Sequence, residues 1–86
     1  MFLYKVGKTF LMKEDRCILT PGYSEVKPHE NLRFKIGDNI KLVFPDGSII
    51  ITKIKGFNLR SPYEILINTT EDIPIGTEVW LTKNEL

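Results

Sequence analysis

The sequence has very few of the residues on which catalytic and metal sites depend. It contains one cysteine, Cys17, and one histidine, His29, in 86 residues. A single cysteine excludes an internal disulfide, and one cysteine with one histidine leaves too few ligands for tetrahedral zinc. No Gly-x-Ser-x-Gly elbow accompanies His29, so nothing indicates a Ser-His-acid triad. We therefore expect a non-enzymatic protein with no catalytic residue, no metal and no cofactor.

Long apolar runs and nucleotide-binding motifs are also missing. No stretch approaches the roughly 20 apolar residues of a membrane-spanning helix. Lys5 and Lys8 interrupt the opening MFLYKVGK, which therefore does not resemble a signal peptide. The chain contains no GxxxxGK[ST], the loop that holds nucleotide triphosphates. These absences predict a cytoplasmic protein that contacts no membrane and binds no nucleotide triphosphate.

The chain has no large excess of charge of either sign. Twelve basic and eleven acidic residues give a net charge of +1, which excludes a strongly basic nucleic-acid binder of the histone kind. The basic residues are nevertheless concentrated, because 11 of the 12 lie in residues 1–60. Either the acidic C-terminal part pairs with the basic part in the fold, or a basic surface is used for binding.

Helical periodicity is nearly absent, whereas short runs of Val, Ile, Thr, Phe and Tyr recur between Gly, Pro, Asn and Asp. Pro45, Asp46 and Gly47 supply turn chemistry between two such runs and predict a hairpin. Residues 21–33, with two prolines and few apolar side chains, are expected to form one long loop. The strands are expected near 2–6, 9–12, 16–20, 39–44, 48–57, 63–68 and 78–82. The pattern predicts a single all-β domain spanning residues 1–86.

One phrase occurs twice in the chain. FKIGDNIKL at 34–42 and IPIGTEVWL at 73–81 share an apolar residue, Ile-Gly, a β-branched residue and Leu at equal spacing. YKVGKTF at 4–10 is a weaker third copy. Glycine can adopt positive φ, so each phrase predicts a sharp turn immediately before a strand. The apolar residues before each glycine are expected to plug one end of a core.

FKIGDNIKLV, TKIKGF and DIPIGTEVWL, taken in order, resemble the second domain of translational GTPases such as elongation factor Tu. The resemblance covers roughly residues 34–82, with Gly37, Ile40, Thr52, Gly76 and Val79 among the matching residues. It implies a small closed antiparallel β-barrel of about six or seven strands. The nucleotide-binding domain of that family is missing, so the family's usual activity is not implied. SH3-like and OB-type barrels remain alternatives.

Alternation in the expected strands leaves several apolar residues opposite the core-facing ones. Val43, Leu66 and Trp80, with Ile49 and Ile51, would lie outside a single-layer barrel and form an apolar patch. Such a patch predicts a protein interface with Trp80 as an anchor. The partner is a different protein or a second copy in a homodimer, unless the 21–33 loop covers the patch.

Nucleic acid is the alternative partner. Lys53, Lys55 and Arg60 lie close together in sequence and are followed by the aromatic Tyr63. Cations for phosphates beside an aromatic platform for a base suit a single-stranded nucleic acid or RNA. The simpler interpretation is that Lys53 and Lys55 are the solvated side of an alternating strand. The sequence therefore predicts a binding module, either for a protein through its apolar face or for single-stranded nucleic acid or RNA through the basic span of residues 33–60.

Overall fold

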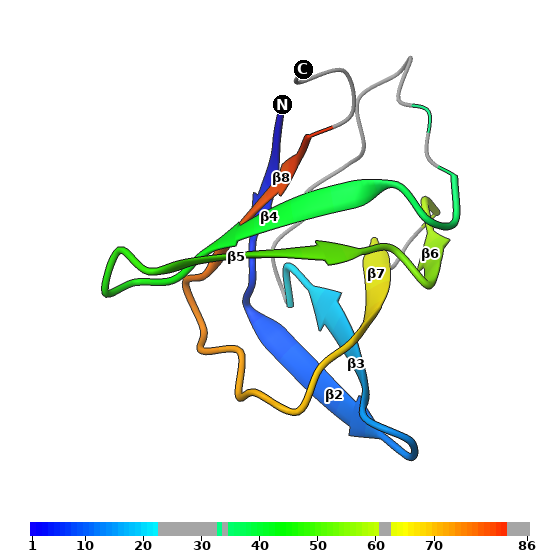
Figure 1. Cartoon of the computed structure of the whole chain (residues 1–86), viewed down its shortest axis with the longest axis horizontal. Helices are drawn as coiled ribbons and strands as arrows, with labels where there is room; N and C mark the ends of the chain where they lie inside the picture. Colours follow the sequence, from blue (N-terminus) through cyan, green and yellow to red (C-terminus); the bar gives the residue numbers. More distant parts are fainter. Residues whose placement is uncertain (23–32, 34, 61–62, 83–86) are drawn as a thin grey trace.

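The computed structural model describes residues 1–22, 33, 35–60 and 63–82 of the chain. Within these residues the protein is all-β, as predicted, with eight strands and no helix (Figure 1). The strands are β1 (Phe2–Lys5), β2 (Lys8–Met12), β3 (Arg16–Thr20), β4 (Asn39–Val43), β5 (Ile49–Lys53), β6 (Gly56–Asn58), β7 (Glu64–Asn68) and β8 (Glu78–Leu81). Consequently no helix of the described chain is long and apolar enough to cross a membrane.

The strands form two four-stranded antiparallel sheets. Sheet A has the order β1-β8-β4-β5, and sheet B has the order β2-β3-β7-β6. Only Val6 and Gly7 separate β1 from β2, and only Ile54 and Lys55 separate β5 from β6. The chain therefore bends from sheet A into sheet B at two places. The strand expected over 48–57 is consequently divided into two, because its two ends belong to different sheets.

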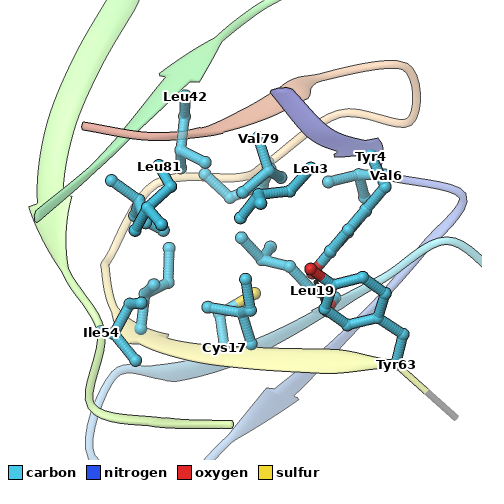
Figure 2. Packing of buried hydrophobic residues seen from close by; sticks show 14 residues of the cluster. Leu3, Tyr4, Val6, Cys17, Leu19, Leu42, Ile54, Tyr63, Val79 and Leu81 are labelled. Carbon is cyan, nitrogen blue, oxygen red and sulfur yellow. Dashed lines mark hydrogen bonds between the residues drawn. The ribbon is translucent and has the colours of Figure 1, made fainter. Parts of the chain in front are cut away.

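The core lies between the inner faces of the two sheets. Leu42, Val79 and Leu81 point from sheet A toward Cys17 and Leu19 of sheet B (Figure 2). In β4 the alternation is regular, since Ile40 and Leu42 are fully buried and their neighbours are not. A bulge in β1 between Phe2 and Tyr4 lets the consecutive residues Leu3 and Tyr4 both be buried.

The predicted hairpin at Pro45–Gly47 joins β4 to β5. Phe44 N–H donates to the Ser48 carbonyl at 2.8 Å, and Gly47 N–H donates to the Phe44 carbonyl at 2.9 Å. Gly47 has φ 90°, a conformation that glycine adopts without steric cost. The Ser48 hydroxyl and N–H both donate to the Asp46 carboxylate, and these bonds lower the pKa of Asp46. The turn is thus closed by both main chain and side chains.

The repeated phrase forms the same structure twice. Gly37 and Gly76 have φ 97° and 92°, and the predicted turn precedes β4 in one case and β8 in the other. Gly37 N–H donates to the Ile54 carbonyl, and Gly76 N–H donates to the Val6 carbonyl, both at 2.8 Å. In return Ile54 N–H donates to the Asp38 carbonyl at 2.9 Å, and Val6 N–H donates to the Thr77 carbonyl at 2.8 Å. Each glycine turn therefore holds one of the two bends between the sheets.

These equivalences extend to the whole described chain. Residues 1–43 form β1 to β4 and residues 49–82 form β5 to β8, and corresponding strands occupy corresponding places in the two sheets. The equivalent strands β3 and β7 pair about Ile18 and Leu66, and β4 and β8 pair about Lys41 and Trp80. An approximate two-fold axis thus passes through the middle of each sheet. We call residues 1–43 and 49–82 the first half and the second half.

Two details of the repeated phrase differ from prediction. Ile36 and Ile75, immediately before the glycines, are 69% and 73% exposed and plug nothing, whereas Ile73 is buried in the core. The weaker copy at 4–10 is no turn of this kind, since Gly7 does not have positive φ. A Cβ on Gly7 would instead collide with the carbonyl oxygen of Pro21. Gly7 is therefore required for close approach of two main chains.

Candidate interaction surfaces

The outer face of sheet A carries most of the predicted apolar patch. Strand register places Ile49 beside Val43, and Ile51 beside Lys41, which in turn lies beside Trp80. Phe2 of β1 completes this row on the far side of Trp80. The sheet A face consists of Phe2, Lys5, Asn39, Lys41, Val43, Ile49, Ile51, Lys53, Glu78 and Trp80.

Trp80 is held in one orientation by its neighbours on this face. Its ring meets the Phe2 ring edge-on, with centroids 5.3 Å apart and planes at 66°. The Lys41 ammonium lies 5.4 Å from the Trp80 ring centroid, within cation–π range. The indole N–H donates to the Glu78 carboxylate at 2.9 Å. The half-buried Trp80 is therefore ordered before any partner arrives, which lowers the entropy lost on binding.

The apolar residues around Trp80 remain accessible to solvent. Ile49 and Ile51 are 55% and 59% exposed, Phe2 is 39% exposed, and Val43 is half-buried. The charges of the face are uneven, since Lys5, Lys41 and Lys53 accompany only Glu78. Exposed apolar residues next to an ordered tryptophan are typical of a binding surface, and this one also has a positive bias.

Leu66, the third predicted interface residue, does not belong to the sheet A face. It lies on the outer face of sheet B, paired with Ile18 on one side and Gly56 on the other. A Cβ on Gly56 would lie 3.3 Å from Leu66 Cδ2, so the glycine makes room for the half-buried leucine. Alternation predicted the side of the strand on which Leu66 lies but not the sheet to which its strand belongs.

The edge strand β2 carries an apolar surface that the sequence analysis missed. Phe10, Leu11 and Met12 are 43%, 69% and 51% exposed. The Lys8 ammonium lies 4.8 Å from the Phe10 ring centroid, so Lys8 shields part of that ring. The signal in the sequence was the run FLM, three consecutive apolar residues in an expected strand. Alternation allows only one face of such a strand to be buried, so part of this run had to be exposed or covered.

The predicted nucleic-acid residues are only partly placed as that prediction requires. Lys53, Lys55 and Arg60 are exposed, and Lys53 lies beside Asn39 on the sheet A face. Tyr63, however, is only 3% exposed, and its ring packs edge-on against Tyr4 with centroids 4.8 Å apart. The prediction that Tyr63 offers a platform for a base is therefore wrong, because the core already covers its ring.

The buried titratable groups are neutral and inert. The Tyr4 hydroxyl donates to the Leu19 carbonyl at 2.7 Å, whereas the Tyr63 hydroxyl has no hydrogen-bond partner among the described residues. Burial raises the pKa of Tyr4 and raises the pKa of Tyr63 to about 12. Burial, with a smaller contribution from Asp72, also raises the pKa of the Cys17 thiol, so little of the nucleophilic thiolate is present.

In the described ranges, no group of three or more His, Cys, Asp or Glu residues is arranged to hold a metal ion. His29 and most of the predicted 21–33 loop lie outside the described residues. Comparison of the chain with protein family models, curated proteins and solved structures yields no match in any of the three.

Proposed function

We propose that the protein is a non-enzymatic, cytoplasmic interaction module that binds another protein through the sheet A face. The observation that carries this proposal is Trp80, ordered by Phe2, Lys41 and Glu78 and bordered by the exposed Ile49 and Ile51. Burying the exposed parts of these side chains contributes about 25 cal/mol for each Å² of apolar surface removed from water. A few hundred Å² would therefore contribute several kcal/mol, and an anchor that is already ordered loses less entropy on binding.

The charges of this face favour a partner with apolar and acidic residues. Lys41 lies between Trp80 and Ile51, Lys53 lies beside Asn39, and Lys5 lies opposite Glu78 in the β1–β8 pairing of the same sheet. A partner carboxylate near Lys41 would complement the positive bias and improve the rate of association. A second copy would instead present Lys41 and Lys53 again, which disfavours self-association through this face.

We also infer that the two sheets form one barrel of six strands. The bends at Val6–Gly7 and Ile54–Lys55 would each carry a single strand around a corner, so that the pairings follow one another in a ring. The two glycine turns that hold the bends support this inference. Such a barrel agrees with the resemblance to the second domain of translational GTPases, which we retain as a proposal about ancestry and fold.

The experiment compares two lysine substitutions in binding to a partner purified from the source cells. Ile51→Lys places a charge in the apolar row and should weaken binding at least about tenfold. Thr70→Lys, at an exposed site away from sheet A, should leave binding unchanged. Far-UV circular dichroism of both variants verifies that the fold is intact.

Dependence on salt distinguishes a protein partner from the alternative, RNA. Binding of a protein through the sheet A face should weaken only modestly with salt, because the charges around Lys41 mainly affect the rate of association, whereas phosphate contacts by Lys53, Lys55 and Arg60 would lose affinity steeply and log-linearly. A steep loss, with unchanged binding by Ile51→Lys, would overturn the protein-interface proposal in favour of RNA.

A further inference from the structure

The edge strand β2 has a surface that the proposed function does not use. It is the outermost strand of sheet B, so one side of its main chain has no strand beside it within the described chain. From Phe10 to Met12 the side chains on both faces of the strand are exposed. Exposed edges of this length normally carry lysines, a proline, a bulge or an inward-pointing charge that prevents strand pairing. In β2 the only such residue is Lys8 at its start, and Phe10, Leu11 and Met12 provide none of these.

The other sheet edges of the described chain differ from β2. β1 contains a bulge, β6 has only three residues, and β5 packs Ile50 against the core on its inner side. β2 therefore combines length, regular pairing with β3 and exposure on both faces in a way that no other edge does.

We propose that β2 pairs with β2 of a second copy of this chain, antiparallel and with Phe10 on the two-fold axis. In this register Phe10 faces Phe10 of the second copy, Leu11 faces Thr9, and Met12 faces Lys8. A β-strand is the occupant that the edge itself indicates, because only an extended chain satisfies alternating main-chain N–H and C=O groups.

A second copy fits this edge because its side-chain rows continue across the axis. On the outer face of sheet B, Leu66, Ile18 and Phe10 form one row in the observed register. The proposed pairing extends this row into Phe10, Ile18 and Leu66 of the second copy. The row thereby becomes apolar across both copies, and cross-strand apolar pairs of this kind stabilise sheets.

The inner face and the charges of β2 are equally compatible with self-pairing. Leu11, the most exposed of the three apolar residues, continues the buried row of Ile67 and Cys17. Pairing would place Leu11 beside Thr9 of the second copy, in a row that continues into that copy's Leu19. No like charges face each other, since Lys8 lies opposite Met12 in both directions. This pairing is independent of the sheet A face and goes beyond the proposed function.

The first experiment is sedimentation velocity over a wide range of protein concentration. The wild type should form a dimer, and Phe10→Lys should raise the dimer dissociation constant at least about tenfold by opposing two lysines on the axis. The control is Ile51→Lys, which also replaces an exposed apolar residue by lysine at the middle of a five-residue edge strand, β5, and should leave the β2 dimer intact. A monomeric wild type at all concentrations, or a dimer broken by Ile51→Lys alone, would overturn the proposal.

A cysteine substitution tests the register even if Phe10→Lys does not fold. Directly opposed residues have Cα atoms about 4.5–5.5 Å apart, within the range that a disulfide spans. Phe10→Cys should therefore form an intermolecular disulfide on mild oxidation, whereas Ile51→Cys should not. The native Cys17 is buried and should not contribute. No cross-link through Phe10→Cys, or an equal yield from Ile51→Cys, would refute this pairing.

Discussion

The two halves of the molecule build the same turn with opposite side-chain chemistry. In the first half, Lys35 N–H donates to the Asp38 carboxylate at 2.9 Å. In the second half, Pro74 replaces Lys35 and has no N–H to donate, so an aspartate there would have no such donor. Thr77 replaces Asp38, and its hydroxyl donates to the Pro74 carbonyl at 2.7 Å. Both halves therefore form the same turn, and each closes it with a different side-chain hydrogen bond.

The halves differ more in the solvent around these turns. Thr77 is fully buried, whereas Asp38 is partly exposed. Water compensates a lost hydrogen bond less well where the side chain is buried than where it is exposed. Substitutions that remove the side-chain hydrogen bond of the turn should therefore cost more in the second half than in the first.

The largest effect should come from Gly7, which lies in the first bend where the second bend has Lys55. Gly7→Ala should lower the free energy of unfolding by about 3 kcal/mol or more, because the added methyl collides with main-chain atoms that cannot rotate away. Urea unfolding followed by circular dichroism measures this loss. A loss similar to that of an exposed glycine would show that the first bend can rearrange.

Alkaline pH should destabilise the contact between the halves at Tyr4 and Tyr63. Burial raises the pKa of Tyr63 from 10.0 to about 12, so above pH 10 the unfolded state holds fewer protons than the folded state. The free energy of unfolding should therefore fall as the pH rises from about 10 to 12. Tyr63→Phe should reduce this fall without loss of stability at neutral pH, because the Tyr63 hydroxyl has no partner in the described chain. An unchanged alkaline fall in Tyr63→Phe would contradict this assignment.

Thr77→Val should lower the free energy of unfolding by about 1–2 kcal/mol, since it removes the partly buried hydrogen bond of a fully buried side chain without changing side-chain volume. Thr82→Val is a suitable control, because its hydroxyl also donates to a carbonyl, that of Asn39, but in an exposed position. The control should change stability by less than about 0.5 kcal/mol. Equal losses in the two variants would show that burial does not distinguish these sites.

Gly37→Ala and Gly76→Ala should each cost about 1 kcal/mol, because both glycines have positive φ. The added methyl meets nothing within 4 Å at Gly37 and only Pro45 Cγ at 3.7 Å at Gly76, so the two costs should be nearly equal. Asparagine tolerates positive φ better, and the corresponding Asn variants should lose less. Strongly unequal alanine costs would show that the turns are not equivalent.

The smallest effect is expected for Asp38→Ala, at about 0.5 kcal/mol, because the bond from Lys35 N–H is exposed. Asp38→Asn, which keeps the acceptor, should be closer to the wild type. Thermal unfolding of the three proteins measures the order. A loss for Asp38→Ala as large as that for Thr77→Val would remove the contrast between the halves.

Local patterns in the sequence predicted much of the fold. Strand positions, the Pro45–Gly47 hairpin and positive φ at Gly37 and Gly76 were all predicted, since each depends on neighbouring residues alone. In the expected strand 63–68, alternation places Tyr63 on the same face as Ile65 and Ile67, which are both buried. Following that pattern would have excluded Tyr63 from a binding site.

The arrangement of strands beside one another was harder to predict. Leu66 and Trp80 both lie opposite core-facing residues, but only strand order shows that they belong to different sheets. Strand order depends on contacts between residues far apart in sequence, which periodicity does not encode. The division of 48–57 into β5 and β6 has the same origin, because the bend at Ile54 is held by Asp38 and Gly37. The partner of the sheet A face also stays a prediction, because periodicity along this chain does not encode contacts with another molecule.

The interleaving of the halves has a consequence for folding kinetics. Each sheet contains strands from both halves, and β1 lies beside β8 (Figure 1). Phe2 is opposite Trp80 in this pairing. Three of the six strand pairings of the described chain, β1–β8, β3–β7 and β4–β8, therefore close long loops, and proteins rich in such pairings fold slowly, in milliseconds to seconds. On the ribosome, all four strands of sheet B are available once β7 has emerged, but sheet A cannot be completed until β8 has emerged. Until then Phe2 and Leu3 of β1 lack the strand that they pair with, so the chain should gain its cooperative stability only after synthesis of its last strand.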